Sequence, residues 1–402
     1  MQTSSRQAYL DWLRIMSIFG VLVFHSAMAF AHGEWWHIKN KETSNLLLEF
    51  IFWLSRFRMP LLFFISGTVS YFMLQKKSGA AFVGLRFRRL LLPLLFGMLL
   101  VVPPQIYLER VTQGFQGNFF DFYPRIFTGK PYPEGDLSWH HLWFIAYLFV
   151  YDVLFTPFFV FVMSHKGRQL LQRINWMARG KWVYLLTVPG ILVYTFTTLL
   201  FPRTNDLIHD WGSLLYWLSF LLVGFVCIAH PLFMESLERN RRTSLGAAFI
   251  TIIAINYVRW NGLEPWEVLQ NYRSDWRTYG YLCLQVVTAW AWLLAAVGYG
   301  KKYLNKTHRS LNYINQAVYP FYILHQTVIV IVVYYVVQVN EGVGMKYAFT
   351  VLVSFALTLG IYHLFIRPYN LTRFMFGMKP KQPVKKQAAN EAQPERDLLQ
   401  TA

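Results

Sequence analysis

Two residues that could do chemistry, Arg14 and His25, lie eleven positions apart within the first hydrophobic segment of the chain. Because an α-helix has 3.6 residues per turn, this spacing places both side chains on nearly the same face, roughly 16 Å apart along the axis. Asp11 falls on the same face. Ionisable groups inside a membrane-crossing helix usually face a protein interior or a wet cavity and mark function. The spacing therefore predicts a functional face on this helix.

His25 carries the side chain best suited to remove a proton from a hydroxyl, because imidazole titrates near neutral pH. The alternative is a histidine that only bonds a backbone carbonyl or a neighbouring helix. Arg14 either meets a phosphate or carboxylate or extends to the membrane surface as an anchor. Asp11 either pairs with Arg14 or stabilises the start of the helix. Position alone leaves these alternatives for Arg14 and Asp11 open.

Arg58 lies near the middle of the second hydrophobic segment, two positions before Pro60. An arginine at that depth needs an anionic partner. We expect Asp152, Glu49 or a bound substrate to supply it, and we favour a functional role for Arg58 over a purely structural ion pair. Gly67, further along the same segment, permits close packing against another helix.

Arg86, Arg88 and Arg89 immediately precede the third hydrophobic segment. Basic residues next to a membrane span are expected on the cytoplasmic side for topological reasons alone. The same three guanidinium groups could also cradle the phosphates of a cytoplasmic substrate. The cluster by itself does not favour either interpretation.

The fourth and ninth segments carry further imidazoles. His141 and Trp143 open the fourth segment at its predicted outer surface, which is typical either of an interfacial aromatic belt or of a sugar-binding surface. Tyr322 and His325, three positions apart, share a face near the middle of the ninth. The chain has no HExxH, P-loop, GxSxG or paired Cys/His motif, so the sequence predicts no metal site.

The elements that must position these residues are membrane-spanning helices. Hydrophobic residues make up 55% of the 402 residues and charged residues only 14%, well below the share in soluble domains. Stretches of about twenty apolar residues, each long enough to cross a bilayer, recur along the chain. We therefore predict an all-α, polytopic integral membrane protein with about ten transmembrane helices, at about 12–32, 46–74, 90–108, 141–163, 182–201, 212–230, 244–260, 278–299, 316–337 and 347–366.

Charge is distributed unevenly between alternate loops. The loops at 75–89 and 164–181 each contain five Lys/Arg and no Asp/Glu. The loops predicted on the opposite side of the membrane contain nine basic and twelve acidic residues in total; they are 33–45, 109–140, 202–211, 261–277 and 338–346. This asymmetry follows the positive-inside rule and predicts cytoplasmic N- and C-termini. The net charge of +18 is thus a topology signal, and no nucleic-acid partner is expected. A cleavable signal peptide is the less favoured alternative for the first segment.

The chain divides into two parts by composition. Residues 1–378 are predicted to form one ten-helix transmembrane domain. Residues 379–402 are polar and rich in Lys, Gln and Pro, which is typical of a disordered cytoplasmic tail.

Taken in order, these features resemble the transmembrane acyltransferase-3 family. The resemblance rests on the Arg14–His25 spacing and on the segments 59–67, 86–89, 141–144 and 319–325. It covers roughly residues 8–370. Within the family, the opening YLDWLR and the segment YPFYILHQ are most similar to the branch of stand-alone members that succinylate periplasmic glucans.

The resemblance implies an O-acyltransferase of the bacterial inner membrane. It would move an acyl group, succinyl or acetyl, from cytoplasmic acyl-CoA to hydroxyls of a periplasmic or cell-surface glucan or other polysaccharide. Acyl-CoA would be a co-substrate, with no bound cofactor. A succinyl group would need a cation for its free carboxylate, which Arg56, Arg58 or the outer histidines could supply.

The resemblance also implies roles for the residues above. His25 would be the catalytic base in a direct transfer or a transient acyl carrier. Arg14 would contact donor phosphate or orient the site, and Arg58 would stabilise negative charge on the thioester carbonyl. The remaining predicted residues fall into three groups: supporting Asp11, His325, Tyr322 and Asp152; donor-binding Arg86, Arg88 and Arg89; and acceptor-binding His141 and Trp143.

Two other functions use the same charged groups. A transporter of a lipid-linked sugar or an anionic solute would line its pathway with them. A structural subunit of an envelope assembly is the least favoured, because intramembrane arginine and histidine are costly to retain without a function. The oligomeric state is left open.

Overall fold

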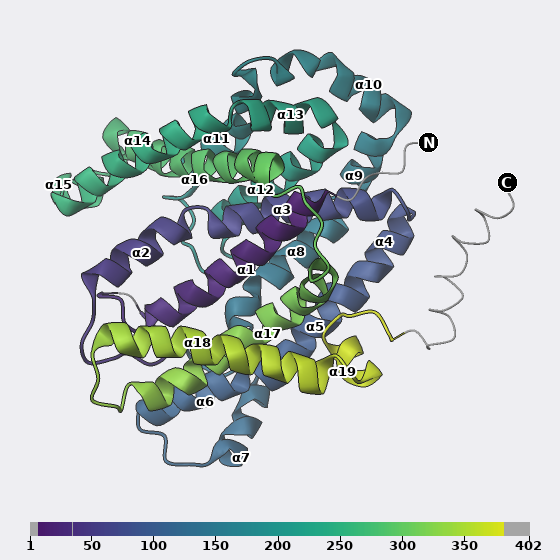
Figure 1. Ribbon diagram of the computed structural model, residues 1–402. Helices are drawn as coiled ribbons and strands as arrows, with labels where there is room; N and C mark the ends of the chain where they lie inside the picture. Colours follow the sequence, from purple (N-terminus) through teal and green to yellow (C-terminus); the bar gives the residue numbers. More distant parts are fainter. Residues whose placement is uncertain (1–6, 34, 382–402) are drawn as a thin grey trace, which may run out of the picture.

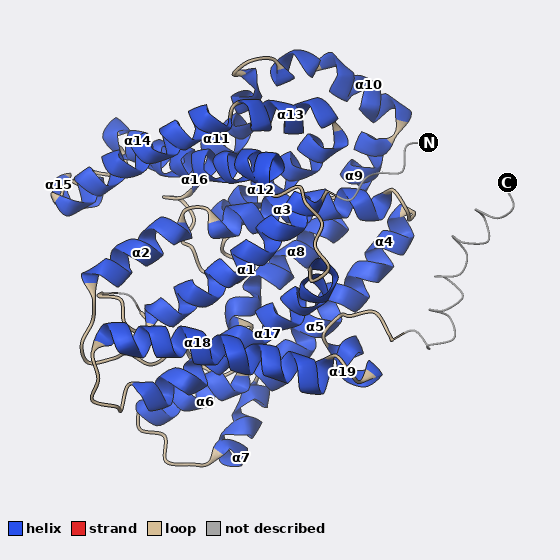
Figure 2. Ribbon diagram, viewed as in Figure 1, coloured by secondary structure: helices blue, strands red, loops and turns tan. Residues whose placement is uncertain are grey.

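The structure is a computed structural model that describes residues 7–33 and 35–381. In the described part, helices joined by loops are the regular elements, with two isolated β-bridges and no strand (Figure 2). The all-α prediction is therefore confirmed. Arg6 and most of the predicted disordered tail, residues 382–402, lie outside the described residues.

The helices differ widely in length. The long ones are α1 (Ala8–Met28), α3 (Arg58–Leu74), α12 (Trp211–Ala229), α14 (Arg241–Trp260), α16 (Trp276–Tyr303), α17 (Leu311–Val336) and α18 (Val343–Ile361). The shorter ones are α2 (Asn45–Ser55), α4 (Gly79–Arg86), α5 (Leu92–Phe96), α6 (Pro103–Thr112), α7 (Phe119–Phe122), α8 (Trp143–Leu154), α9 (Thr156–Met163), α10 (His165–Arg173), α11 (Val188–Thr197), α13 (Pro231–Arg239), α15 (Pro265–Val268) and α19 (Asn370–Met375).

Within the described residues, seven helical segments are long and apolar enough to cross a membrane, and the bent pair His140–Leu154 and Thr156–Met163 would make an eighth. The predicted count of ten is not confirmed. The other two predicted segments are helical but differ in character. One is the shorter apolar helix Trp182–Thr197. The other is α14, which carries Arg241, Arg242 and Arg259.

Several spans are broken rather than straight. Helices α2 and α3 are separated at Arg56 and Phe57, so that Pro60 lies in the first turn of α3, where a missing N–H is tolerated. Helices α8 and α9 meet at an angle of 55°. The segment from α4 to α6 contains two π-helical turns, Phe87–Leu91 and Gly97–Val101. Such turns are frequent at functional sites.

Close packing fixes α3 against α12, which lie side by side (Figure 1). A Cβ atom on Gly67 would lie 2.0 Å from the carbonyl oxygen of Leu221, and one on Gly224 would lie 2.0 Å from that of Phe64. Both positions therefore require glycine. The close packing expected at Gly67 is confirmed, and it holds the broken α2–α3 span in place.

Helix α17 forms the centre of the molecule. In its most apolar window 83% of the residues are buried, against 28% for the span Val343–Ile366. It packs against α1, α6 and α18 (Figure 1). Side chains on α17 are therefore in reach of the predicted functional face of α1.

Candidate active site

The two central histidines meet across the α1–α17 interface. Nδ1 of His25, on α1, lies 2.9 Å from Nε2 of His325, on α17. Their rings are nearly parallel, with an interplanar angle of 7°. His325 is buried, whereas His25 is partly accessible. The predicted functional face of α1 thus contacts the imidazole that the sequence placed near the middle of the ninth segment.

Hydrogen bonds define which nitrogens of this pair carry protons. Nδ1 of His325 bonds the backbone carbonyl of Tyr322, and since a carbonyl oxygen only accepts, this nitrogen is the donor. In the neutral ring, Nε2 of His325 is then an acceptor, and Nδ1 of His25 donates to it. The lone pair of His25 is consequently on Nε2. In this tautomer Nε2 is the atom of His25 that can take up a proton, and His325 is the residue that orients the His25 ring.

Tyr322 and His141 support the pair from the neighbouring helices. The hydroxyl of Tyr322 donates to the backbone carbonyl of His141, and Nε2 of His141 donates to the carbonyl of Ile323 at 2.9 Å. The His141 ring stands edge-on to that of His325, with centroids 5.1 Å apart. All of these groups are buried.

His141 does not lie at an outer surface, as the sequence analysis expected. It is 5% exposed, because the 3₁₀ turn His140–Leu142 brings it against α17 before α8 begins. Trp143 packs against Phe63 and Trp217, with ring centroids 6.1 and 5.7 Å away. Any contact of these two residues with an acceptor would therefore be made inside the protein.

Arg58 lies beside the histidine pair but is not ion-paired to either of its expected protein partners. Glu49 binds Arg259 at 2.9 Å, and Asp152 binds Arg86 at 2.8 Å. The guanidinium of Arg58 lies over the ring of Phe24, the residue before His25, at 3.3 Å from the centroid. Its buried Nε has no hydrogen-bond partner among the described residues. Arg58 is thus available to an anionic ligand.

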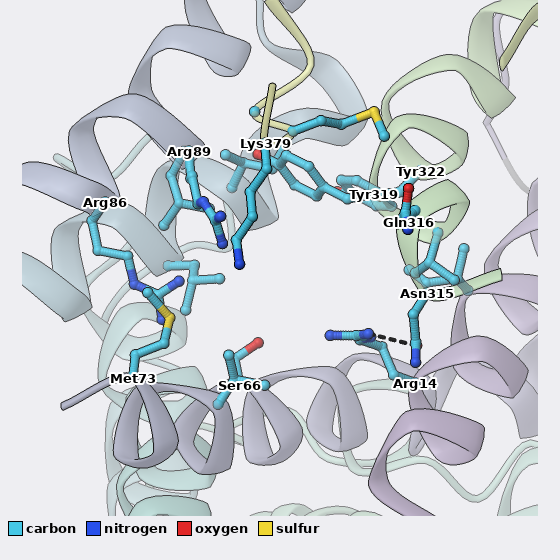
Figure 3. Close-up of a pocket in the computed structure, with 18 of the residues that line it drawn as sticks. Arg14, Ser66, Met73, Arg86, Arg89, Asn315, Gln316, Tyr319, Tyr322 and Lys379 are labelled. Atoms are coloured by element: carbon cyan, nitrogen blue, oxygen red, sulfur yellow. Dashed lines mark hydrogen bonds between the residues drawn. The ribbon is translucent and has the colours of Figure 1, made fainter. Parts of the chain in front are cut away.

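A cavity of about 720 Å³, which we call the basic cavity, opens next to this group (Figure 3). Arg14 points into it and donates to the side-chain oxygen of Asn315 at 2.7 Å, and it also contacts Asp11 at 3.4 Å. Arg14 is therefore directed toward the interior rather than to the membrane surface. Tyr322 forms part of the wall, one helical turn from His325.

The three arginines before the third segment behave differently from one another. Arg86 and Arg89 line the basic cavity, whereas Arg88 is exposed and does not (Figure 3). Arg86 is itself buried and held by Asp152, which also accepts a hydrogen bond from Ser70 at 2.8 Å. Asp152 thus supports the cavity wall.

Sequence analysis missed the cations that complete the basic cavity. These lie after α18, two in the last part of the predicted transmembrane domain and two at the start of the predicted tail: Arg367, Arg373, Lys379 and Lys381. Arg373 anchors the last described segment by donating to the carbonyl of Lys379 at 2.7 Å. Gly377, at a φ of 65°, lies too close to the carbonyl of Arg89 for any side chain. The predicted boundary at residue 379 therefore cuts through this wall.

The lining of the basic cavity combines cations with apolar side chains. Seven of its described lining residues are Lys or Arg, and none is Asp or Glu. Apolar side chains make up much of the remaining lining, among them Ile18, Leu62, Ile65, Phe144 and Ile145. Such a cavity suits a ligand with several negative charges at one end and an uncharged chain at the other.

A second buried cluster, not found by sequence analysis, joins His37, Glu109 and His140. Their possible ligand atoms lie within 4.8 Å of one another, as in sites that hold a metal ion. However, Nδ1 of His37 bonds Glu109, and the rings of His37 and His140 are stacked at an angle of 18°, so their in-plane lone pairs do not converge. The arrangement is that of a histidine–carboxylate pair.

Nearby groups complete this second cluster. The hydroxyl of Tyr132 donates to Glu109 at 2.9 Å, and burial together with the Glu109 charge raises the pKa of Tyr132. Gln326, the residue after His325, lies 3.2 Å from Nε2 of His37. The cluster is therefore adjacent to the histidine pair, and only the proximity of three distant segments creates it.

Comparisons with known proteins identify the family of this chain. Residues 7–363 match the acyltransferase domain of the acyltransferase-3 family. The glucans biosynthesis protein C of Salmonella typhimurium is 21% identical over 395 residues, which cover 95% of this chain and 97% of that protein. Proteins of the same name from Salmonella heidelberg and Salmonella paratyphi B match to the same extent. No solved structure matches the chain.

Proposed function

Since this chain belongs to the acyltransferase-3 family and is a membrane acyltransferase, we propose that it transfers an acyl group from acyl-CoA to hydroxyls of an extracytoplasmic glycan. The acyl group would be succinyl or acetyl, and the acceptor a periplasmic or cell-surface glucan. The observation that carries this proposal is the His25–His325 pair, which Tyr322 connects to the basic cavity: Tyr322 lines that cavity, and its carbonyl accepts a hydrogen bond from His325.

The basic cavity supports a coenzyme A thioester as the donor. Coenzyme A carries phosphates at one end and a long uncharged arm that ends in the thioester. Arg14, Arg89 and Lys379 would bind the phosphates from three different parts of the chain. The arm would lie along the apolar wall and bring the thioester to Tyr322 and the histidine pair.

In the direct transfer that we propose, Nε2 of His25 is the base. The acceptor hydroxyl oxygen attacks the thioester carbonyl carbon while its proton passes to Nε2 of His25. The carbonyl oxygen becomes negative and is stabilised by the guanidinium of Arg58. The carbon–sulfur bond then breaks, and the leaving thiolate takes the proton back from Nε2. The products are an ester on the glycan and free coenzyme A.

His325 acts in this scheme as a positioning residue. When His25 gains a proton it becomes a cation, and its Nδ1–H donor strengthens its bond to the acceptor Nε2 of His325. His325 in turn is held by the Tyr322 carbonyl. The chain of bonds thus favours the charged form of His25 that exists in the transition state.

The glucan acceptor is supported by the relatives alone. Their name assigns them to glucan biosynthesis, and they span nearly the same length as this chain. Positive loops on one side of the bundle support a cytoplasmic mouth for the basic cavity. Donor and acceptor would then approach the histidine pair from opposite sides of an inner membrane.

The test is a transfer assay in inverted membrane vesicles that contain the full chain. Radiolabel from acetyl-CoA or succinyl-CoA is followed into extracted glucan. We expect His25→Ala to lower transfer by about 10²–10⁴-fold, the usual contribution of a general base. His308→Ala, which changes an exposed histidine, is the matched control and should retain activity.

Two results would contradict the proposal. One is full transfer by His25→Ala at the same membrane level as the wild type. The other is movement of an unmodified sugar or anion across the vesicle membrane with no donor consumed, which would indicate a transporter.

A further inference from the structure

A second cavity, of about 320 Å³, is lined by Arg58 and by Phe24, the residue before His25. We call it the arginine cavity, because Arg56, Arg58 and Arg203 all line it. The first two come from the break between α2 and α3, and the third comes from the loop between α11 and α12. Residues from two distant parts of the chain thus place three cations around one cavity.

The arginine cavity contains no carboxylate among its described lining residues. Arg56 lies over the ring of Phe52 and 3.5 Å from the side-chain oxygen of Gln285. Arg203 lies over the ring of Trp217 at 5.4 Å from the centroid. The nearby acid Glu49 is engaged by Arg259 through two hydrogen bonds. The three guanidinium groups therefore have aromatic and amide neighbours but no ion-pair partner in the described structure.

Three like charges around one small space are unfavourable inside a membrane protein unless an anion joins them. Guanidinium groups bind carboxylates and phosphates through paired, charge-assisted hydrogen bonds. The buried Nε of Arg58, which lacks a partner among the described residues, is one such donor. The size, the charge and this unpaired donor all indicate a bound anion.

Arg58 connects the arginine cavity to the reacting centre. Its guanidinium lies over the ring of Phe24, which precedes His25 in the sequence, and Phe24 also lines the arginine cavity. An anion bound between Arg56, Arg58 and Arg203 would therefore be part of a molecule that also reaches His25. Arg58 would then serve both the bound anion and the reacting thioester, which favours a substrate group over a separate effector molecule.

We propose that the arginine cavity is a subsite for a carboxylate or phosphate group of a substrate held at His25. The inference rests on the proposed transfer function and adds a selectivity to it. The anion could belong to the acyl group, as the terminal carboxylate of a dicarboxylic acyl chain, or to an acidic substituent on the acceptor. Both sources present the same chemistry to the three arginines.

Anion binding is tested first, without any reaction. Succinate and inorganic phosphate are titrated calorimetrically into the purified full chain in lipid nanodiscs. We expect Arg203→Gln to raise the Kd for at least one of them by about tenfold or more, because a hydrogen bond to a charged group is lost. Arg273→Gln, which removes an exposed arginine outside both cavities, should leave the Kd unchanged. Because the basic cavity is unaltered in both variants, the difference reports the arginine cavity.

The transfer assay then identifies the source of the anion. If the acyl carboxylate is the ligand, Arg56→Gln and Arg203→Gln lower kcat/KM for succinyl-CoA by about tenfold or more and leave acetyl-CoA transfer nearly unchanged. If an acidic acceptor is the ligand, they lower transfer from both donors to that acceptor but not to a neutral glucan. Equal loss for every donor and acceptor, or no loss at all, would overturn the inference.

The two proposals fail in different ways. If the wild type transfers no acyl group from any donor, the proposed function is wrong, and the calorimetric result still decides whether the cavity binds anions. If the wild type transfers acyl groups and Arg203→Gln binds succinate and phosphate as tightly as the wild type does, only the subsite is wrong.

Discussion

Replacing His325 by Phe separates orientation of His25 from its chemistry. Phe retains an aromatic ring at the buried position but lacks the Nε2 that accepts from Nδ1 of His25 at 2.9 Å. A buried donor left without an acceptor costs about 1–3 kcal/mol. Because this bond strengthens when His25 becomes charged, its loss weakens the transition state more than the ground state. We therefore expect kcat to fall about tenfold to a hundredfold.

The assay is the transfer of label from acyl-CoA, with kcat and both KM values measured separately. A fall in kcat with little change in either KM is the expected result, because His325 does not line the basic cavity. His325→Gln offers a side-chain oxygen that can accept from His25 and should recover part of the loss. Thermal unfolding of each variant shows whether the fold is retained.

A double-mutant cycle gives the decisive comparison. If His325 acts only through His25, then His25→Ala combined with His325→Phe should be no slower than His25→Ala alone. A further loss of the full single-mutant factor in that background would refute the orienting role. So would a His325→Phe variant with undiminished kcat.

Two other predictions concern the scaffold and the donor site. Gly224→Ala should lower the free energy of unfolding by about 1–3 kcal/mol or more, because its Cβ would lie 2.0 Å from the Phe64 carbonyl oxygen. Urea titration in detergent measures this free energy, and an unchanged value would contradict the packing described for α3 and α12. Lys379→Gln should raise KM for acyl-CoA about tenfold without lowering kcat, because it removes one cation from the basic cavity. The control Lys306→Gln lies outside the cavity and should leave KM unchanged. Equal KM values for the two variants would contradict the assignment of the basic cavity to the donor.

The hydrophobic pattern predicts where helices occur but not how they bend. All ten predicted segments contain helix, yet neither the break at Arg56 nor the 55° bend between α8 and α9 follows from composition. Both depend on packing between distant segments, such as the contact of Gly67 with Leu221. The same limit explains why the predicted count of ten is not confirmed: α14, which carries Arg241, Arg242 and Arg259, is not among the helices apolar enough to cross a membrane.

The candidate site shows a similar division. Spacing within one helix correctly placed Arg14, and also His25, facing the protein interior, since helix geometry is a local property. Partners from other segments did not follow from spacing. Asn315 beside Arg14 and Asp152 beside Arg86 are products of the tertiary fold. Listing the histidines of the predicted loops would have included His37, but its bond to Glu109 depends on the tertiary fold.

The basic cavity is closed by the first and last parts of the chain that the structure describes. Arg14 comes from the first helix, and Lys379 lies in the segment held by Arg373 and Gly377 (Figure 3). During synthesis on the ribosome, a nascent chain that has inserted every helix through α18 still lacks this wall. The full cation set forms only after the segment that follows α19 has left the exit tunnel. The protein can therefore bind a donor with its full set of cations only after this last segment has been synthesised.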